Sequence, residues 1–132
     1  FELVYIDPPY ISEQGIGVDY YQFYHFLEGL TMYSSWEDQI DFQSKHRRLK
    51  TIKSVWTEPK KIREAFKKLL DQFPESILVV SYRDPGIPPK DEIITFLEDC
   101  RSKVLTFSKK HKYVLSAKKK RGKTQELLFI GL

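Results

Sequence analysis

The chain has 132 residues, of which 41% are hydrophobic and 14% aromatic, enough to build one globular domain with a buried core. No apolar run is long enough to span a membrane, so we expect no membrane partner. A single cysteine, Cys100, excludes an internal disulfide framework. That cysteine usage is compatible with a reducing compartment, and we expect a cytoplasmic protein.

The net charge is +4 at pH 7, and the basic residues are concentrated in two clusters, at positions 45–53 and 109–123. A lysine-rich loop is often only a solvated surface. Two such clusters in one chain nevertheless favour a partner with a phosphate backbone. The residues from which we expect backbone contacts are Arg47, Arg48, Lys118, Lys119, Lys120 and Arg121.

The first predicted element is a buried strand at Leu3–Ile6, which ends abruptly in Asp7-Pro8-Pro9-Tyr10. Neither proline can donate a backbone hydrogen bond, but both carbonyls remain as acceptors in fixed directions. Asp7 adds a carboxylate acceptor and Tyr10 adds a flat ring. Two acceptors beside a stacking surface suit a planar ligand with an exocyclic amine, such as adenine.

Residues 11–56 are predicted to be an insertion with helical and irregular parts. Apolar and aromatic residues recur at helical spacing over residues 20–30, with Gly29 as an interruption or end. A capping-box pattern predicts a second, short helix over residues 35–42.

The next helix is predicted to begin at Thr57, with Pro59 in its first turn, and to end at Phe73-Pro74. Its apolar residues share one helical face: Ile62, Phe66, Leu69, Leu70 and Phe73.

The remainder alternates between strands and a helix. A strand over residues 76–82 has the continuous apolar run of a parallel sheet covered by helices on both faces. A helix follows Pro88-Pro89, and two strands are expected over residues 104–107 and 126–131. This order indicates an α/β domain with an antiparallel strand pair at its C-terminal end.

The Asp7-Pro8-Pro9-Tyr10 turn resembles the (D/N/S)-P-P-(Y/F/W) motif of S-adenosylmethionine-dependent amino-methyltransferases, and most resembles the Dam-like DNA adenine-N6 branch. Three weaker motifs follow in matching order over the whole chain: Ser81-Tyr82-Arg83, Tyr113-Val114-Leu115-Ser116 and Glu126-Leu127-Leu128. The resemblance implies the second half of a class I, Rossmann-like methyltransferase sheet. It also implies methyl transfer to adenine N6 on a base flipped out of DNA.

The same resemblance implies the roles of individual residues. Asp7, through its side chain, and Pro8, through its carbonyl, would accept hydrogen bonds from the amine, and Pro9 would keep the turn rigid. Tyr10 would stack on one face of the base and Tyr113 on the other. Asp7 would also touch the edge of the cofactor.

Two elements of the family pattern are missing from the chain. The glycine-rich Phe-x-Gly-x-Gly loop that holds S-adenosylmethionine is not found, and neither is the acid that binds its ribose. Gly15-x-Gly17 lies inside the insertion. In the Dam-like arrangement, both the cofactor half and the target-recognition region precede the motif. We therefore expect residues 1–132 to be one catalytic segment of a longer protein, inactive alone.

Several alternatives remain open at this stage. The substrate could be RNA, cytosine N4 or a protein amide, and the role could lie in restriction–modification, repair or regulation. The chain could be a non-catalytic nucleic-acid-binding remnant. It could also be one half of a split enzyme, with a separate chain docked beside Leu3–Ile6. No metal is expected, because His25, His46 and His111 lack the spacing of metal ligands.

Overall fold

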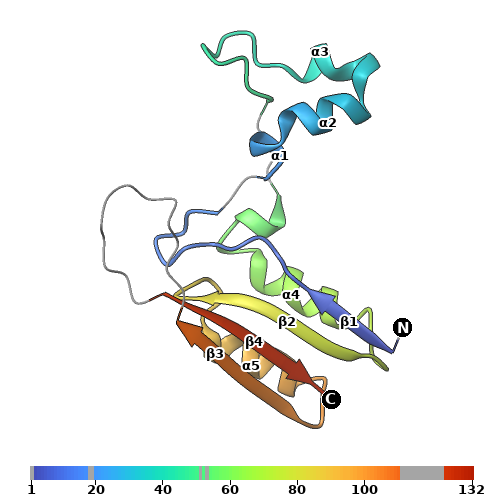
Figure 1. Cartoon of the computed structure of the whole chain (residues 1–132), viewed down its shortest axis with the longest axis vertical. Helices are drawn as coiled ribbons and strands as arrows, with labels where there is room; N and C mark the ends of the chain where they lie inside the picture. Colours follow the sequence, from blue (N-terminus) through green and yellow to red (C-terminus); the bar gives the residue numbers. More distant parts are fainter. Residues whose placement is uncertain (1, 18–19, 51, 53, 111–123) are drawn as a thin grey trace.

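A computed structural model describes residues 2–17, 20–50, 52, 54–110 and 124–132. It contains a four-stranded sheet with helices on one face, and a helical lobe that projects away from it (Figure 1). The elements of the sheet body are β1 (Leu3–Ile6), η2 (Val55–Thr57), α4 (Ile62–Leu70), β2 (Ile77–Asp84), α5 (Lys90–Glu98), β3 (Val104–Lys110) and β4 (Gln125–Gly131). The elements of the lobe are α1 (Tyr20–Phe23), α2 (His25–Thr31), η1 (Tyr33–Ser35) and α3 (Trp36–Gln39).

The strand order in the sheet is β1-β2-β4-β3. β1 is parallel to β2, whereas β4 is antiparallel to both of its neighbours, β2 and β3. The first three strands therefore run in one direction, and the last strand of the chain lies between two of them in the opposite direction. This confirms the predicted α/β class and the antiparallel pair at the C-terminal end.

Strands β2 and β3 extend beyond their predicted carboxyl ends. The β2–β4 ladder continues through Arg83 and Asp84, and the β3–β4 ladder continues through Lys109 and Lys110. These residues are polar, so hydrophobic patterning did not place them in strands. Ladder hydrogen bonds involve only the backbone, so pairing continues after the apolar pattern has ended.

One face of the sheet is covered by α4 and α5, and the core lies between these layers. Phe66 of α4 is fully buried and packs its ring against Tyr82 of β2 and Trp56, with centroids 5.7 and 5.4 Å apart. Leu78, Val80, Tyr82, Leu127 and Phe129 supply the strand side of the core. The alternation of buried residues along β2 follows from the two-residue period of a strand.

The other face of the sheet is open within the described part of the chain. Leu3 and Tyr5 of β1 remain 55% and 58% exposed, and Ile77 and Phe107 are also exposed. The register places Tyr5 beside Val79, so the open face is a continuous apolar surface across the strands. The prediction that helices cover both faces is therefore wrong for this part of the chain.

The predicted start of the helix at Thr57 is also wrong. Thr57 ends the short 3-10 helix η2, whose first turn is capped by Ser54, and α4 begins only at Ile62. Glu58 has extended backbone angles, with φ −101° and ψ 113°. A residue before proline avoids the helical region, so Pro59 prevents the helix from running back to Thr57.

The helical lobe (residues 20–50) has shorter helices than predicted. Tyr24, with φ −108° and ψ 28°, separates α1 from α2, and Gly29 lies within α2. Trp36 packs directly on this glycine: a Cβ atom there would lie 2.1 Å from Trp36 Cε2. The expected helix over residues 35–42 is limited to α3. None of the described helices is long and apolar enough to cross a membrane.

Candidate functional site

The Asp7–Tyr10 turn begins directly after β1, at the carboxyl end of a strand. Ile6 is paired with Val80 in the parallel β1–β2 ladder, so the turn emerges beside the carboxyl half of β2. β3 runs in the same direction, so its carboxyl end lies at the same end of the sheet. Crevices at this end of a parallel sheet are the usual ligand sites of open α/β folds.

Asp7 and Tyr10 are held together across the two prolines. The Tyr10 hydroxyl donates a hydrogen bond of 2.7 Å to Asp7 Oδ1. Asp7 is exposed, Pro8 is buried, and Pro9 and Tyr10 are half-buried. The turn therefore presents an oriented carboxylate to solvent on a rigid and partly buried base.

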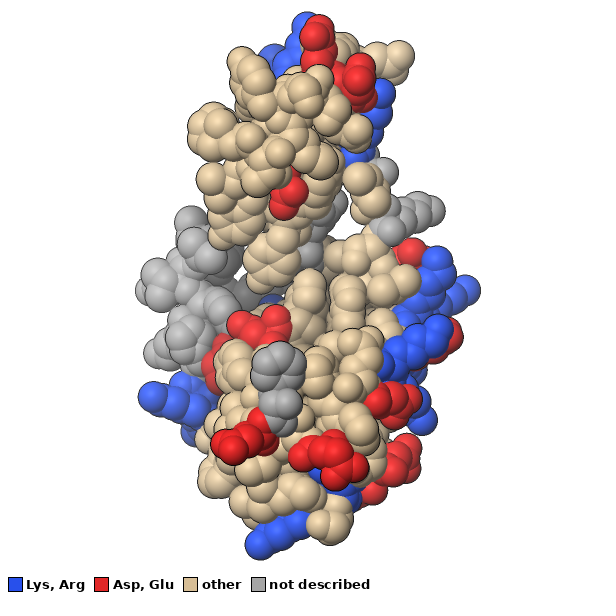
Figure 2. Space-filling model, turned by 90° about the vertical axis from the view of Figure 1, so that its right-hand side faces the viewer, with Lys and Arg blue, Asp and Glu red and all other residues tan. Residues whose placement is uncertain are grey.

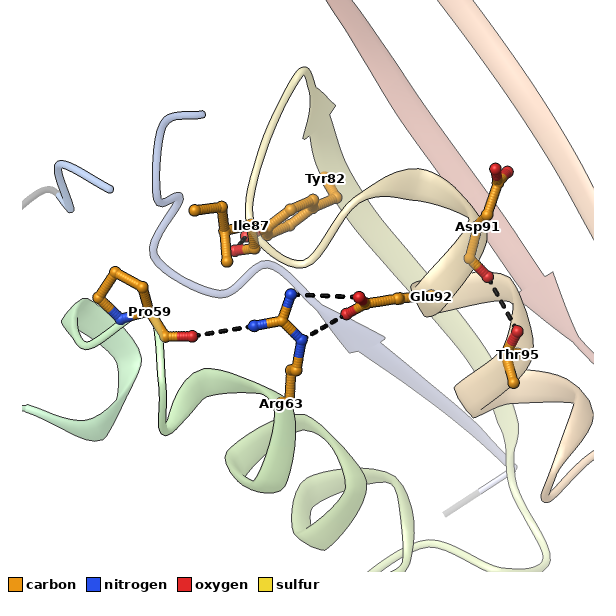
Figure 3. Close-up of polar contacts among 7 residues, drawn as sticks. All are labelled: Pro59, Arg63, Tyr82, Ile87, Asp91, Glu92 and Thr95. Atoms are coloured by element: carbon orange, nitrogen blue, oxygen red, sulfur yellow. Dashed lines mark hydrogen bonds and ion pairs between the residues drawn. The ribbon is translucent and has the colours of Figure 1, made fainter. Parts of the chain in front are cut away.

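The Tyr10 ring packs against the ring of Tyr82 on β2. The two rings meet edge to face, with centroids 5.2 Å apart and an angle of 82° between their planes. Tyr82 has no exposed surface, and its hydroxyl donates a hydrogen bond to the Ile87 carbonyl (Figure 3). Ile87 in turn donates its N–H to the Ile11 carbonyl, over 3.0 Å.

An ion pair joins the first turns of α4 and α5. The guanidinium of Arg63 contacts both carboxylate oxygens of Glu92, at 2.6 and 3.1 Å, and donates a third hydrogen bond to the Pro59 carbonyl (Figure 3). Two parallel hydrogen bonds fix direction as well as distance. The pair therefore holds the two helices in register beneath the loop that carries Ile87.

The ionisation of the two tyrosines follows from their surroundings. Burial raises the pKa of Tyr10 well above its usual value; the Ser81 side chain lowers it, and the hydrogen bond to Asp7 raises it further. Burial also raises the pKa of Tyr82 to about 12. Both phenols therefore keep their protons at neutral pH, and Tyr10 acts as a donor toward Asp7.

Arg47 and Arg48 lie in the helical lobe rather than at the turn. Arg47 donates to the Phe42 carbonyl and places its guanidinium 5.2 Å from the centre of the Phe42 ring. Arg48 lies 3.6 Å from Asp41 in a partly exposed ion pair. Both side chains are thus engaged within their own loop. The other predicted contact residues, Tyr113, Lys118, Lys119, Lys120 and Arg121, lie outside the described residues.

The Gly15-x-Gly17 pair does not form a cradle for a cofactor. A Cβ atom at Gly17 would lie 3.1 Å from Thr57, and one at Gly15 would lie 3.4 Å from Pro59. These glycines therefore pack against the chain itself. Within the part of the chain that the structure describes, this glycine pair offers no space for the adenosyl cofactor. Among the described residues, no group of three His, Cys, Asp or Glu side chains could hold a metal ion.

Sequence reasoning did not find the supporting residues of the turn, Ile11, Arg63, Ile87 and Glu92. The weak motif Ser81-Tyr82-Arg83 includes Tyr82 but does not indicate a contact with Tyr10. The usable signal is the segment from Tyr82 to Gly86, in which an aromatic residue ends the apolar run shortly before Pro and Gly. No protein-family model, curated protein or solved structure matches the chain.

Proposed function

We propose that the chain is the catalytic segment of a Dam-like DNA adenine-N6 methyltransferase, in which the Asp7–Tyr10 turn holds the exocyclic amine of a flipped adenine. The observation that carries the proposal is the position of this motif at the carboxyl end of a parallel strand, with Asp7 exposed and oriented by Tyr10. The substrate class comes from the resemblance of the motif.

The chemistry of the turn suits an aromatic amine. The lone pair of adenine N6 is delocalised into the ring, so the amine attacks only when acceptors draw on its two N–H groups. Tyr10 engages Asp7 Oδ1, and the exposed side of that carboxylate remains open to a ligand. A second acceptor would be the Pro8 carbonyl. Such preoriented acceptors lower the barrier without reorganisation during the reaction.

The strand arrangement supports this family. The resemblance implies a mostly parallel sheet that finishes with an antiparallel strand. β1, β2 and β3 share one direction, and the final strand β4 opposes them.

The open face of the sheet supports a second part of the proposal, that a cofactor-binding half packs there. This half would belong to the same protein or to a separate chain. Leu3, Tyr5 and Ile77 are exposed apolar residues on that face. Among the described residues β1 pairs only with β2, which leaves its outer edge available for another strand. A cofactor-binding half that covers this face and pairs with this edge would supply the cofactor cradle that Gly15 and Gly17 do not form.

Basic residues would hold the DNA backbone in this proposal. Lys109 and Lys110 end β3 at the same end of the sheet as the turn, and both are exposed. Arg47 and Arg48 would have to exchange their contacts with Phe42 and Asp41 for phosphate. The proposed contacts outside the described residues are Lys118, Lys119, Lys120 and Arg121, with Tyr113 as a second stacking residue.

The experiment is labelled methyl transfer from S-adenosylmethionine to duplex DNA, using the chain joined to its natural upstream sequence. We expect label on adenine N6, and a loss of roughly 100-fold or more in kcat for Asp7→Ala. Asp99→Ala is the matched control, because Asp99 is an exposed carboxylate on the helix side of the body, paired with Lys67.

Two other outcomes would contradict the proposal. Cofactor binding without label on DNA would favour an RNA or protein substrate. Absence of both label and cofactor binding would favour a nucleic-acid-binding remnant.

A further inference from the structure

The Tyr10 hydroxyl makes a contact that base stacking does not require. Any aromatic ring stacks on a base, and the motif that this turn resembles accepts Tyr, Phe or Trp at this position. We propose that the Tyr10 hydroxyl is a positioning group that locks the Asp7 carboxylate, and that Tyr82 is the positioning residue that holds Tyr10 in place. This inference rests on the proposed function and assigns separate roles to the ring and hydroxyl of one residue.

The first step is the geometry of the turn. Two consecutive prolines separate Asp7 from Tyr10, and each proline fixes its own φ. The two prolines therefore restrict the backbone between the two residues, and the hydrogen bond of 2.7 Å limits the remaining side-chain freedom of Asp7. Tyr10 is half-buried and protonated, so it remains a donor. Without the bond, the exposed Asp7 side chain would sample several rotamers.

The second step is a closed ring of contacts around Tyr10. Its ring rests on Tyr82; the Tyr82 hydroxyl binds the Ile87 carbonyl; and the Ile87 N–H binds the carbonyl of Ile11. Ile11 is fully buried and directly follows Tyr10 in the chain. The cycle thus returns to the residue next to Tyr10, and Tyr10 is held through both its side chain and its backbone.

The loop between Tyr82 and Ile87 is packed too closely to allow much adjustment. A Cβ atom at Gly86 would lie 2.9 Å from the Arg83 carbonyl oxygen and 3.0 Å from Tyr82 Cε1. Contacts this short leave no room for a side chain. The support for Tyr10 is therefore rigid, which is the property a positioning residue must have.

The test compares Tyr10→Phe with the unchanged protein in the methyl-transfer assay, with the upstream sequence present. The variant keeps the stacking ring and loses only the hydroxyl. We expect kcat to fall roughly tenfold, as for loss of one hydrogen bond to a charged group, with the KM for DNA unchanged. Base flipping, followed by the fluorescence of 2-aminopurine at the target position, should be retained.

Two further variants separate positioning from a general loss of structure. Tyr82→Phe keeps the buried ring but loses the bond to Ile87, and it should lower kcat in the same direction by a smaller factor. Tyr33→Phe removes a hydroxyl from an exposed tyrosine of the lobe and should change nothing. An unchanged kcat in Tyr10→Phe, or a raised KM alone, would overturn the inference.

A second readout does not depend on activity. The carboxyl carbon of Asp7, assigned through Asp7→Asn, is followed by carbon-13 NMR in the same protein. Its resonance should move in Tyr10→Phe and stay in place in Tyr33→Phe. A resonance that does not move in Tyr10→Phe would refute the lock even if methyl transfer is confirmed. Movement without any methyl transfer would keep the lock and reject the proposed function.

Discussion

The sheet body and the helical lobe use the same kinds of residue in opposite ways. In the sheet body, Phe66, Tyr82 and Phe129 have no exposed surface. In the lobe, Phe23 and Tyr33 are each 75% exposed, and most other large apolar residues of α1 and α2 are also exposed. Figure 2 shows the lobe standing off the body, with much of its visible surface uncharged.

The aromatic residues are buried in the body and exposed in the lobe because only the body has two packed layers. In the body, two helices of nine residues each lie across a sheet, and the space between the layers holds large side chains. The helices of the lobe have four, seven and four residues and have no sheet to cover. Trp36 on Gly29, and the buried Leu49, are its main internal contacts. Aromatic content therefore predicts a core only where two layers meet; elsewhere it produces an exposed apolar surface.

The largest expected effect is that of Phe66→Ala. Phe66 contacts Trp56, Tyr82 and Phe96 at the centre of the body, so its removal leaves a cavity. We expect a loss of about 3–5 kcal/mol in the free energy of unfolding, measured with urea. Phe23→Ala in the lobe is the matched control and should cost less than about 0.5 kcal/mol. Equal losses would remove the distinction between the two regions.

Trp36→Ala should affect the lobe alone. Its ring packs on Gly29, meets Phe26 edge to face and lies tilted against Tyr33, so its loss removes most of the lobe's internal packing. We expect the amides of Asp41 and Lys50 to exchange with solvent about tenfold faster or more, because local opening becomes easier. The Ile87 amide of the body should exchange as before. Faster exchange at Ile87 would show that the lobe stabilises the body.

At alkaline pH, the buried Tyr82 of the body should affect stability, whereas the exposed Tyr33 of the lobe should not. The pKa of Tyr82 is raised by burial from 10.0 to about 12, so the folded state holds a proton that the unfolded state releases earlier. This contribution is fully present below pH 10 and is lost as the pH rises from 10 to 12. We expect the free energy of unfolding to fall by about 2 kcal/mol over this range, measured by urea unfolding at several pH values. The fall should be shallower in Tyr82→Phe but not in Tyr33→Phe. Equal slopes in all three proteins would contradict this assignment.

The smallest expected effect comes from the ion pair between α4 and α5. Arg63 and Glu92 are both partly exposed, so solvent screens their attraction. Arg63→Gln should lower the free energy of unfolding by about 0.5–1 kcal/mol, less than the core substitution by a wide margin. A double-mutant cycle with Glu92→Gln measures the pairwise term. A coupling near zero would mean that the pair does not help to hold the two helices together.

The sequence by itself was sufficient for the local features of the chain. The apolar run Leu3–Ile6 and the two prolines after it identified the first strand and the turn, and the apolar face of residues 62–70 identified α4. Asp7 and Tyr10 are only three residues apart on a rigid turn, so their proximity is a local property. Such features depend on backbone sterics and short-range periodicity, which each segment carries alone.

Only the tertiary structure decided what supports that turn and what remains uncovered. Tyr82 reaches Tyr10 because β1 and β2 pair in one particular register, although the two residues are 72 positions apart. The insertion of β4 between β2 and β3, and the exposure of Leu3 and Tyr5, likewise depend on which strands pair and which face the helices cover. The physical reason is that these contacts join distant segments, and local patterning does not encode which segments meet.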